Sequence, residues 1–395
     1  MKAAHIVFLC HPETACSTSM PRFASMLCKG MIDRSFSVDC WTAPALFSKM
    51  IPSRGAIYKW LGYIDSYLIF PVLLRRRLTK LGPNTLMVVT DNALGMWVSH
   101  IITMPHVVHC HDFLAQRSEI GEIPEHKTGP TGRIYQRLIR RGFRQGRNFI
   151  SVSRKTREDL NRFLLRAPEV SEMVYNGLNY PFKPLDSAAA AAQLESVVGT
   201  ELKQGYFLHV GGNQWYKNRL GVLKLYHHYS LAAGDAIPLV MVGAVPDREL
   251  VEYSKQLPSN GKVQFASGLM DCQVNAAYAG ATALIFPSLE EGFGWPIVEA
   301  HASGCPVITT NLAPMTEVGG QAAWYLDRRQ CLSESEDEAW AKRGAHMLKK
   351  ISYLCNEERS QLVSRSIANS SRFKTEVALD RIENIYRSIL AKPVN

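Results

Sequence analysis

The sequence predicts an α/β protein made of two domains, each with a parallel β-sheet. Short apolar runs alternate with longer amphipathic segments along most of the chain, which is the pattern of βαβ units. A turn-rich segment interrupts this alternation near the middle of the chain. The chain has 395 residues, of which 46% are hydrophobic, so it is too long for one ordinary core and fits two domains.

In the first half of the chain, five short apolar runs are expected to form strands. They are His5–Cys10, Ser37–Thr42, Leu86–Thr90, Val107–Cys110 and Asn148–Val152. Tyr175–Pro184 then contains Asn-Gly and two prolines, which are turn signals, and a polar, alanine-rich segment follows at residues 186–205. We therefore place the domain boundary here and assign residues 1–184 to the first domain.

The second half repeats the alternation and ends in a helical pattern. Its expected strands are Tyr206–Val210, Pro238–Val242, Lys262–Phe265, Ala283–Phe286 and Val307–Thr309. Apolar residues recur at helical spacing in Thr375–Leu390. We assign residues 185–372 to the second domain and 373–395 to a terminal helix. Because ligands of open parallel sheets bind beyond the carboxyl ends of strands, residues just after strands are the first site candidates.

Composition excludes several classes of protein. Charged residues make up 20% of the chain, as in a soluble globular protein, and the nine cysteines form no CxxC pair. We therefore expect neither a disulfide framework nor a zinc knuckle, and a reducing cytoplasm is the expected location. The apolar run near the N-terminus is too short for a signal peptide, and no stretch reaches the roughly 18 apolar residues of a membrane-spanning helix.

Positive charge is concentrated in the first half. Residues 1–180 carry a net charge of +11, whereas the remainder carries −1. Such asymmetry indicates a nucleic acid, an anionic membrane surface or an acidic substrate as partner. Because no nucleic-acid-binding signature accompanies it, we expect no nucleic acid and favour a membrane surface or a phosphate-bearing acceptor.

The stretch Ala283–Thr310 carries the most specific motif. A buried strand is followed by the loop Pro287–Gly294, and Pro296 suits the first turn of a helix that runs to about Ser303. The helix N-terminus would point free N–H groups at the loop, which makes an anion site suited to a diphosphate.

Two carboxylates frame this loop, Glu291 before the helix and Glu299 in its expected first turn. A carboxylate can accept hydrogen bonds from two sugar hydroxyls, so one glutamate suits a hexose and the other a ribose. The alternative is that Glu299 only complements the helix dipole and that Glu291 is a solvated loop residue.

With this motif and four others, the chain resembles glycosyltransferase family 4, a family of retaining GT-B enzymes. The other four are HCHD (His109–Asp112), SVSRKTREDL (Ser151–Leu160), YNGLN (Tyr175–Asn179) and VGGNQWYKN (Val210–Asn218). The resemblance implies two Rossmann-like domains that face each other across a cleft, with a C-terminal helix that crosses back to the N-terminal domain. It also implies a donor-binding C-terminal domain and an acceptor-binding N-terminal domain.

The resemblance assigns roles to individual residues. Glu291 would hold the donor-sugar hydroxyls, His111 would lie near the donor sugar, and Lys217 would neutralise the departing diphosphate. The remaining donor-binding residues would be Glu299, Gly212, Asn213, Arg219, Leu269, Gly292, Phe293, Gly294, Trp295, Pro296 and Ile297.

The chain departs from the family pattern at three places. Gly212 stands where many members have a diphosphate-binding arginine, and Arg219 could compensate or simply begin a helix. The loop after the first strand has no glycine, and we interpret it as an acceptor-side loop. His109 and His111 could form a metal pair, although no third ligand is evident and packing is the alternative for His109. The chain lacks an Asp-x-Asp motif, and we expect neither a metal nor another cofactor.

The segment Tyr58–Leu78 allows two interpretations. Aromatic residues from Trp60 to Phe70 interleave with Leu and Ile, and Arg75–Arg77 follow. Aromatic residues beside a basic cluster are typical of a membrane-interface segment, which would hold the protein at the inner face of the cytoplasmic membrane. The alternative is a buried helix with a solvated arginine end.

The function predicted from the sequence is retaining transfer of a hexosyl group. The donor would be a UDP- or GDP-sugar, and the acceptor a hydroxyl of a glycan or lipid-linked sugar in bacterial cell-surface polysaccharide synthesis. The alternatives are a GT-B-shaped sugar-nucleotide epimerase, a non-catalytic sugar-nucleotide-binding homologue and a two-domain solute-binding protein. The sequence leaves open the donor base and sugar, the acceptor, the linkage and the oligomeric state.

Overall fold

The structure is a computed structural model that describes residues 4–12, 19–50, 55–330 and 333–392. The chain divides into two compact units. Residues Met1–Asn179 and Thr375–Asn395 form the N-terminal unit, and Tyr180–Lys374 form the C-terminal unit. The terminal helix α15 (Thr375–Leu390) thus belongs to the N-terminal unit, although the residues before it in the sequence belong to the C-terminal unit.

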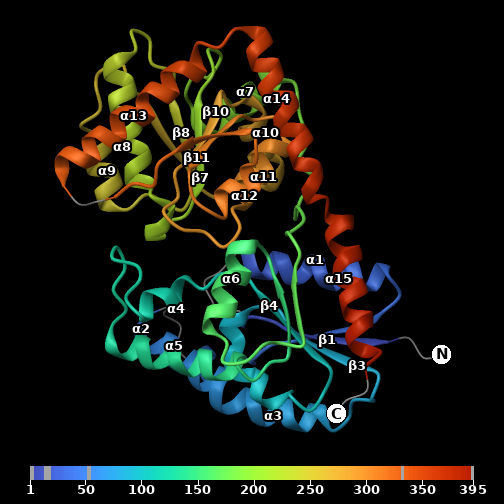
Figure 1. Ribbon diagram of the computed structural model, residues 1–395. Coiled ribbons are helices and arrows are strands. Elements are labelled where there is room, and N and C mark those ends of the chain that lie inside the picture. Colours follow the sequence, from blue (N-terminus) through green and yellow to red (C-terminus); the bar gives the residue numbers. More distant parts are fainter. Residues whose placement is uncertain (1–3, 13–18, 51–54, 331–332, 393–395) are drawn as a thin grey trace. The chain divides into compact units, whose positions relative to one another are not determined.

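The N-terminal unit is built on a six-stranded parallel sheet with the order β2-β1-β3-β4-β5-β6 (Figure 1). Its strands are β1 (His5–Leu9), β2 (Ser37–Trp41), β3 (Thr85–Val89), β4 (His106–Cys110), β5 (Asn148–Ser151) and β6 (Val170–Met173). Strands β3, β4 and β5 are buried along their whole length, because helices cover both faces of the sheet.

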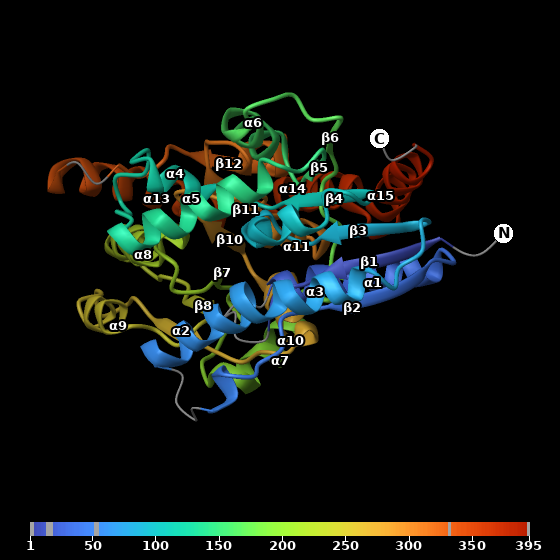
Figure 2. The ribbon, with the colours of Figure 1, turned by 90° about the horizontal axis from the view of Figure 1, so that it is seen from below.

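Helices lie on both faces of the N-terminal sheet. Figure 1 shows α1 and α15 on one side and α3 and α5 on the other. The helical segments are α1 (Ser19–Asp33), η1 (Ser48–Met50), α2 (Ala56–Ile64), the π-helical turn η2 (Asp65–Ile69), α3 (Phe70–Leu78), η3 (Asn92–His100), α4 (Leu114–Glu119), α5 (Pro130–Phe143), α6 (Arg154–Phe163) and α15. Figure 2, turned by 90°, shows the strands β1, β3 and β4 side by side.

The C-terminal unit contains a second six-stranded parallel sheet, with the order β12-β11-β10-β7-β8-β9. Its strands are β7 (Phe207–Gly211), β8 (Leu239–Gly243), β9 (Val263–Ala266), β10 (Ala283–Phe286), β11 (Val307–Thr310) and β12 (Ala323–Leu326). The core on one face of this sheet includes Phe207 and Ile285 of the strands, Tyr226 of a helix after β7 and Trp340 of a helix after β12.

The helices of this unit also divide between the two faces. Figure 1 shows α8, α9 and α13 on one side and α7, α10, α11 and α14 on the other. The helical segments are α7 (Ser187–Val198), η4 (Trp215–Lys217), α8 (Arg219–Ala232), α9 (Arg248–Ser254), α10 (Asp271–Gly280), α11 (Trp295–Ala302), α12 (Met315–Gly319), α13 (Glu334–Ser352), α14 (Asn356–Ser370) and η5 (Ser371–Phe373).

The predicted fold class of two parallel-sheet domains with a returning helix is confirmed. Sequence patterns missed the edge strands β6 and β12, which have only four residues each and are partly exposed. The alanine-rich segment near the predicted domain boundary forms α7, a helix that the sequence analysis did not predict. Asp186 caps its first turn, and Gly199 ends it with φ +66°, a backbone conformation that favours glycine.

The helices of the structure can also be compared with the length and hydropathy of a membrane-spanning helix. Within its described ranges, no helix combines the length and the apolar character that crossing a bilayer requires.

Candidate active site

The C-terminal sheet brings two predicted catalytic residues into contact. After β7 the chain moves to β8 on one side, whereas β10 lies on the other side of β7, so the strand order reverses between β7 and β10. Ligands of such sheets bind at this switch point, beyond the carboxyl ends of the strands. Lys217 follows β7 and Glu291 follows β10, and Lys217 Nζ lies 2.8 Å from Glu291 Oε1.

Backbone and amide hydrogen bonds hold the two loops together. Asn218, with φ +52°, donates from Nδ2 to the carbonyl of Pro287 at 2.9 Å. The backbone N–H of Leu289 donates to the carbonyl of Tyr216 at 2.8 Å. The loop after β7 and the loop after β10 therefore form one connected structure, which fixes the geometry of the ion pair.

The ion pair is largely shielded from water. The side chain of Lys217 is 15% exposed and that of Glu291 is 9% exposed. Lys217 Nζ also lies 5.1 Å from the ring centroid of Phe286 and 5.3 Å from that of Tyr216. The alternative that Glu291 is a solvated loop residue is therefore wrong, because only 9% of its side chain is exposed.

Arg219 is the second cation at this edge of the sheet. It begins α8, is 4% exposed, and donates from Nη1 to the Ala244 carbonyl at 3.0 Å and to Asn213 Oδ1. Its Nε and Nη2 are also buried, and neither has a hydrogen-bond partner within the described residues. Burial lowers the pKa of Arg219, an effect that the charge of Asp247 opposes, but a guanidinium remains charged.

The helix after β10 starts at the position that the sequence predicts. Gly294 precedes α11 with φ +101°, and Pro296 occupies its first turn. Glu299, however, lies in the second turn and not in the first, because the helix begins at Trp295. The prediction for that position is corrected accordingly, and the helix dipole acts on Glu299 less than expected.

Tyr278 of α10 is a contact of Glu299 that sequence reasoning missed. Its hydroxyl donates to Glu299 Oε2 at 2.9 Å. Burial, followed by the charge of Glu299, raises the pKa of Tyr278, so the hydroxyl keeps its proton and orients the carboxylate. No motif signals this residue, because it lies inside an unremarkable helix 21 residues before its partner.

The other predicted donor residues lie in the same unit. Gly212 directly follows β7, and the half-buried Leu269 lies three residues after β9. Phe293 is buried, with its ring 6.0 Å from that of Trp295 and 5.8 Å from that of Phe373. The remaining members of the loop and helix start are Gly292, Gly294, Pro296 and Ile297.

His111 is placed in the N-terminal unit, directly after β4. Its ring is buried, and Nε2 donates to the carbonyl of Thr90 at 3.0 Å. Burial lowers the pKa of His111, which favours the neutral ring. His109 instead contacts the Tyr386 hydroxyl at 2.7 Å and is a packing residue of the core. The described residues contain no group of three His, Cys, Asp or Glu arranged to bind a metal.

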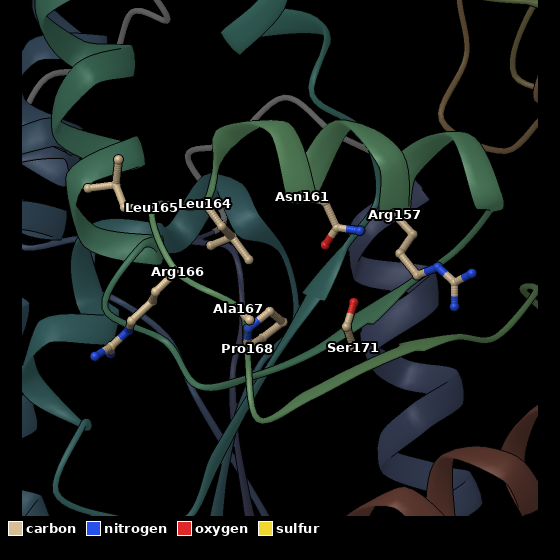
Figure 3. A pocket seen from close by; sticks show the side chains of 8 residues that line it. All are labelled: Arg157, Asn161, Leu164, Leu165, Arg166, Ala167, Pro168 and Ser171. Atoms are coloured by element: carbon tan, nitrogen blue, oxygen red, sulfur yellow. The ribbon is translucent and has the colours of Figure 1, made fainter.

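A surface hollow of about 620 Å³ lies elsewhere in the N-terminal unit (Figure 3). Arg157 and Asn161 of α6 stand on one side of it, and Ser171 of β6 and Pro168 of the segment before β6 line the other. This segment connects the end of α6 to the start of β6, so the hollow lies away from the carboxyl ends of the strands. We therefore assign it no part in the candidate active site.

Comparisons with known proteins identify the family and support the fold. Residues 20–180 match the family model Glycosyltransferase Family 4, and residues 192–362 match Glycosyl transferases group 1. Among solved structures, HepE from Anabaena, whose crystal contains UDP and glucose, has 15% sequence identity and a TM-score of 0.69. The match covers 98% of this chain and 100% of HepE, and it shows the GT-B fold.

Two curated relatives are sugar transferases. The chain is 28% identical over 163 residues to O-antigen chain mannosyltransferase B of Escherichia coli, a match that covers 38% of this chain and 43% of the relative. It is 25% identical over 198 residues to O-antigen chain mannosyltransferase RfbU of Salmonella typhimurium, which covers 49% and 51%. The chain thus matches about half the length of these relatives or less. Taken with the two family models, these similarities show that the chain belongs to the family 4 glycosyltransferases, with a C-terminal domain of the group 1 type.

Proposed function

We propose that the protein is a retaining glycosyltransferase that moves a hexosyl group from a nucleoside diphosphate sugar to a hydroxyl of a glycan or lipid-linked acceptor. Mannose is the first candidate for the sugar, because the two curated relatives described above are mannosyltransferases. Their names, which refer to the O-antigen chain, support a role in cell-surface polysaccharide synthesis.

One observation carries this proposal: two cationic side chains and a carboxylate converge on one sheet edge, with hydrogen-bond donors still unused. Arg219 keeps two buried N–H groups without a partner in the described structure, and Lys217 is only two residues away. Unused buried donors on a charged group are costly, and a bound diphosphate would satisfy them.

The arrangement suits stabilisation of a leaving diphosphate. In the proposed complex, Glu291 accepts hydrogen bonds from donor-sugar hydroxyls, and Glu299 accepts them from the ribose. Lys217, Arg219 and the N–H groups at the start of α11 balance the charge that develops on the diphosphate as the glycosidic bond breaks. The diphosphate takes the proton of the acceptor hydroxyl in this scheme. We propose that no metal ion is needed, because these protein groups supply the positive charge.

The proposed partner of the N-terminal unit is an anionic membrane surface. The segment Tyr58–Leu78 has two faces: Phe70 and Leu74 are fully buried, whereas Trp60 is 61% exposed and Leu68 is 64% exposed. The buried interpretation therefore holds for one face of this segment, and the exposed apolar residues of the other face support the proposed membrane contact. Ile57 and Val72 are also exposed, and the exposed Arg75–Arg77 follow.

Helix α5 extends this surface. The hydroxyls of Tyr67 and Tyr135 lie 2.6 Å apart, which joins η2 to α5. Ile134 and Leu138 of α5 are exposed, and the exposed Arg133, Arg137 and Arg141 lie along the same helix. Apolar side chains flanked by arginines complement the acyl boundary and the headgroups of an anionic bilayer.

Thermal unfolding tests the proposed donor. A ligand that binds only the folded state raises the midpoint, so we expect one sugar nucleotide among GDP-mannose, UDP-glucose, UDP-N-acetylglucosamine and ADP-glucose to stabilise the protein. We expect Arg219→Gln to abolish this stabilisation, with Arg248→Gln, which lies in a different helix, as the control. If none of the four sugar nucleotides raises the unfolding midpoint, the result counts against the proposal.

Product analysis separates the enzymatic alternatives. A transferase releases a nucleoside diphosphate and a glycoside, an epimerase returns an isomerised sugar nucleotide, and a non-catalytic homologue binds the donor without consuming it. Proton NMR of the reaction mixture distinguishes all three outcomes, and the anomeric coupling of the product reports retention or inversion.

A further inference from the structure

The N-terminal sheet has a switch point of its own, between β1 and β3. The chain passes from β1 to β2 on one side, and β3 pairs with β1 on the other. His11 lies two residues beyond β1, and Asp91 lies two residues beyond β3. His11 Nε2 is 2.8 Å from Asp91 Oδ2. The pair thus stands at the position in this sheet that Lys217 and Glu291 take in the other sheet, where ligands of parallel sheets bind.

Local contacts hold both side chains in place. Asp91 Oδ1 accepts a hydrogen bond from the backbone N–H of Ala93 at 2.9 Å, at the start of η3. Thr42 Oγ1 donates to the carbonyl of His11 at 3.1 Å. The side chains of His11 and Asp91 are 15% and 12% exposed, so the pair is fixed and only a small part of it reaches the surface.

The position of the proton on His11 follows from its partner. Burial raises the pKa of Asp91, but the hydrogen bond and charge of His11 more than offset this, so the pKa lies below its usual value. An ionised carboxylate only accepts hydrogen bonds, which places the imidazole proton on Nε2. The other ring nitrogen, Nδ1, accepts a hydrogen bond in a neutral ring and donates one in a charged ring, and no described residue is hydrogen-bonded to it.

The chemistry of this pair differs from that of the second sheet. Lys217 and Arg219 suit an anion, whereas the negative charge of Asp91 disfavours a phosphate beside it. A hydroxyl group, by contrast, can donate to Nδ1 or accept from it, and it brings no charge into the site. The pair is therefore suited to an uncharged, hydroxyl-rich ligand.

We infer that the His11–Asp91 pair binds the sugar end of the acceptor, with His11 Nδ1 hydrogen-bonded to an acceptor hydroxyl and Asp91 orienting the ring. This inference rests on the proposed function, since it names the group that positions the second substrate. His11 is a binding residue in this scheme and takes up no proton.

The variant His11→Gln separates binding from folding. The glutamine amide can still donate to Asp91, but it has no hydrogen-bonding group in the place of Nδ1. The matched control is His5→Gln, because His5 pairs with Asp39 at 3.2 Å near the opposite end of the same strand. Both variants remove one imidazole from a His–Asp pair, and thermal unfolding checks that each is folded.

The measurement uses octyl α-D-mannopyranoside and the octyl glycosides of galactose and N-acetylglucosamine as probes, because they present sugar hydroxyls without charge. Calorimetry and saturation-transfer NMR give the Kd of each glycoside, and thermal shift gives donor binding. We expect His11→Gln to weaken the best glycoside about tenfold, as loss of one hydrogen bond predicts, while donor binding and the His5→Gln control stay unchanged.

Three results would overturn the inference. They are unchanged glycoside binding by His11→Gln, equal weakening by His5→Gln, and no saturable binding of any glycoside to the wild-type protein. Failure of the proposed function looks different, because the wild-type protein would then bind no sugar nucleotide at all.

Discussion

At the scale of single residues, the candidate donor site depends on pairs of side chains more than on isolated ones. The sequence motif identifies Glu291 and Glu299 but does not reveal what each contacts. In the structure Glu291 pairs with Lys217, and Glu299 accepts from the hydroxyl of Tyr278. Each glutamate is therefore held in a defined orientation before any ligand binds, which reduces the cost of ordering it on binding.

Glu299→Gln is expected to weaken donor binding about tenfold while changing kcat less. The substitution keeps the size of the side chain but removes the charge that accepts hydrogen bonds from the proposed ribose hydroxyls. Titration with the stabilising sugar nucleotide gives the Kd. Glu252→Gln, an exposed carboxylate on α9 paired with Lys255, is the control. Wild-type affinity in Glu299→Gln would remove this residue from the donor site.

The sequence predicted much of the donor site because its residues follow strands or belong to one continuous motif. Tyr278 and the pairing of His11 with Asp91 escaped prediction for a physical reason. They depend on contacts between residues 21 and 80 positions apart, which no local pattern encodes. The same reason explains why Glu291 was weighed as a solvated residue, since its burial comes from a loop 74 residues earlier in the chain.

At the scale of elements, a buried charge network supports the loops of the donor site. Asp337 at the start of α13 accepts from Arg329 at 2.7 Å and from Lys224 of α8. Arg329 also donates to Asn218 Oδ1 at 3.0 Å, and Asn218 holds the loop after β10. The network thus connects α8 and α13 to the loops that carry the ion pair.

Asp337→Asn is expected to lower the free energy of unfolding by about 3 kcal/mol, because it leaves two cations without their carboxylate. Burial raises the pKa of Asp337, but hydrogen bonds from Arg329 and Lys224 lower it to about 2, below its ordinary value of 3.8. The contribution of the ionised Asp337 to the free energy of unfolding is therefore complete above about pH 4 and is lost as pH falls toward 2.

Urea unfolding at pH 7 and at intervals down to pH 2 measures this effect. The difference in free energy of unfolding between wild type and Asp337→Asn should become smaller as pH falls from about 4 toward 2. The control is Glu338→Gln, since Glu338 is the next residue and pairs with Lys342 at the surface. The free energy of unfolding of this variant should stay close to that of the wild type at every pH. A pH-independent difference for Asp337→Asn would show that the ion pairs are not its source.

The exposed face of α2, η2 and α3 leads to a prediction about vesicle binding. Co-sedimentation should increase with the fraction of anionic lipid and decrease with salt, which screens the arginines. Changing Arg75, Arg76 and Arg77 to glutamine should weaken binding, and Trp60→Ser should weaken it even at low salt. Arg343→Gln in the C-terminal unit is the control. Equal recovery with neutral and anionic vesicles would contradict the proposed surface.

At the scale of the whole molecule, sequence patterns predicted the two-sheet architecture because helices cover both faces of each sheet. Central strands buried on both faces are apolar throughout and stand out from their surroundings. The edge strands β6 and β12, which have four residues each and are partly exposed, were missed, although the edge strands β2 and β9 were predicted. Helix α7 was not predicted, because its run of alanines shows no clear helical spacing of large apolar residues.

Independence from metal ions is a prediction for the whole enzyme. If Lys217, Arg219 and the start of α11 balance the charge of the diphosphate, then EDTA should leave donor turnover unchanged. The assay compares nucleoside diphosphate release with and without EDTA, and then after addition of manganese or magnesium. Complete loss in EDTA with recovery on adding either metal would refute the charge balance proposed here.

The central claim is that the Lys217–Glu291 pair is where the donor sugar is held and transferred. The most direct test is the rate of nucleoside diphosphate release by wild type and by Glu291→Gln, measured with the sugar nucleotide that stabilises the wild type best. We predict at least about a 100-fold lower kcat in Glu291→Gln, with the Kd of the free nucleoside diphosphate and cooperative thermal unfolding retained. A folded Glu291→Gln protein that turns over the donor at close to the wild-type rate would contradict the account.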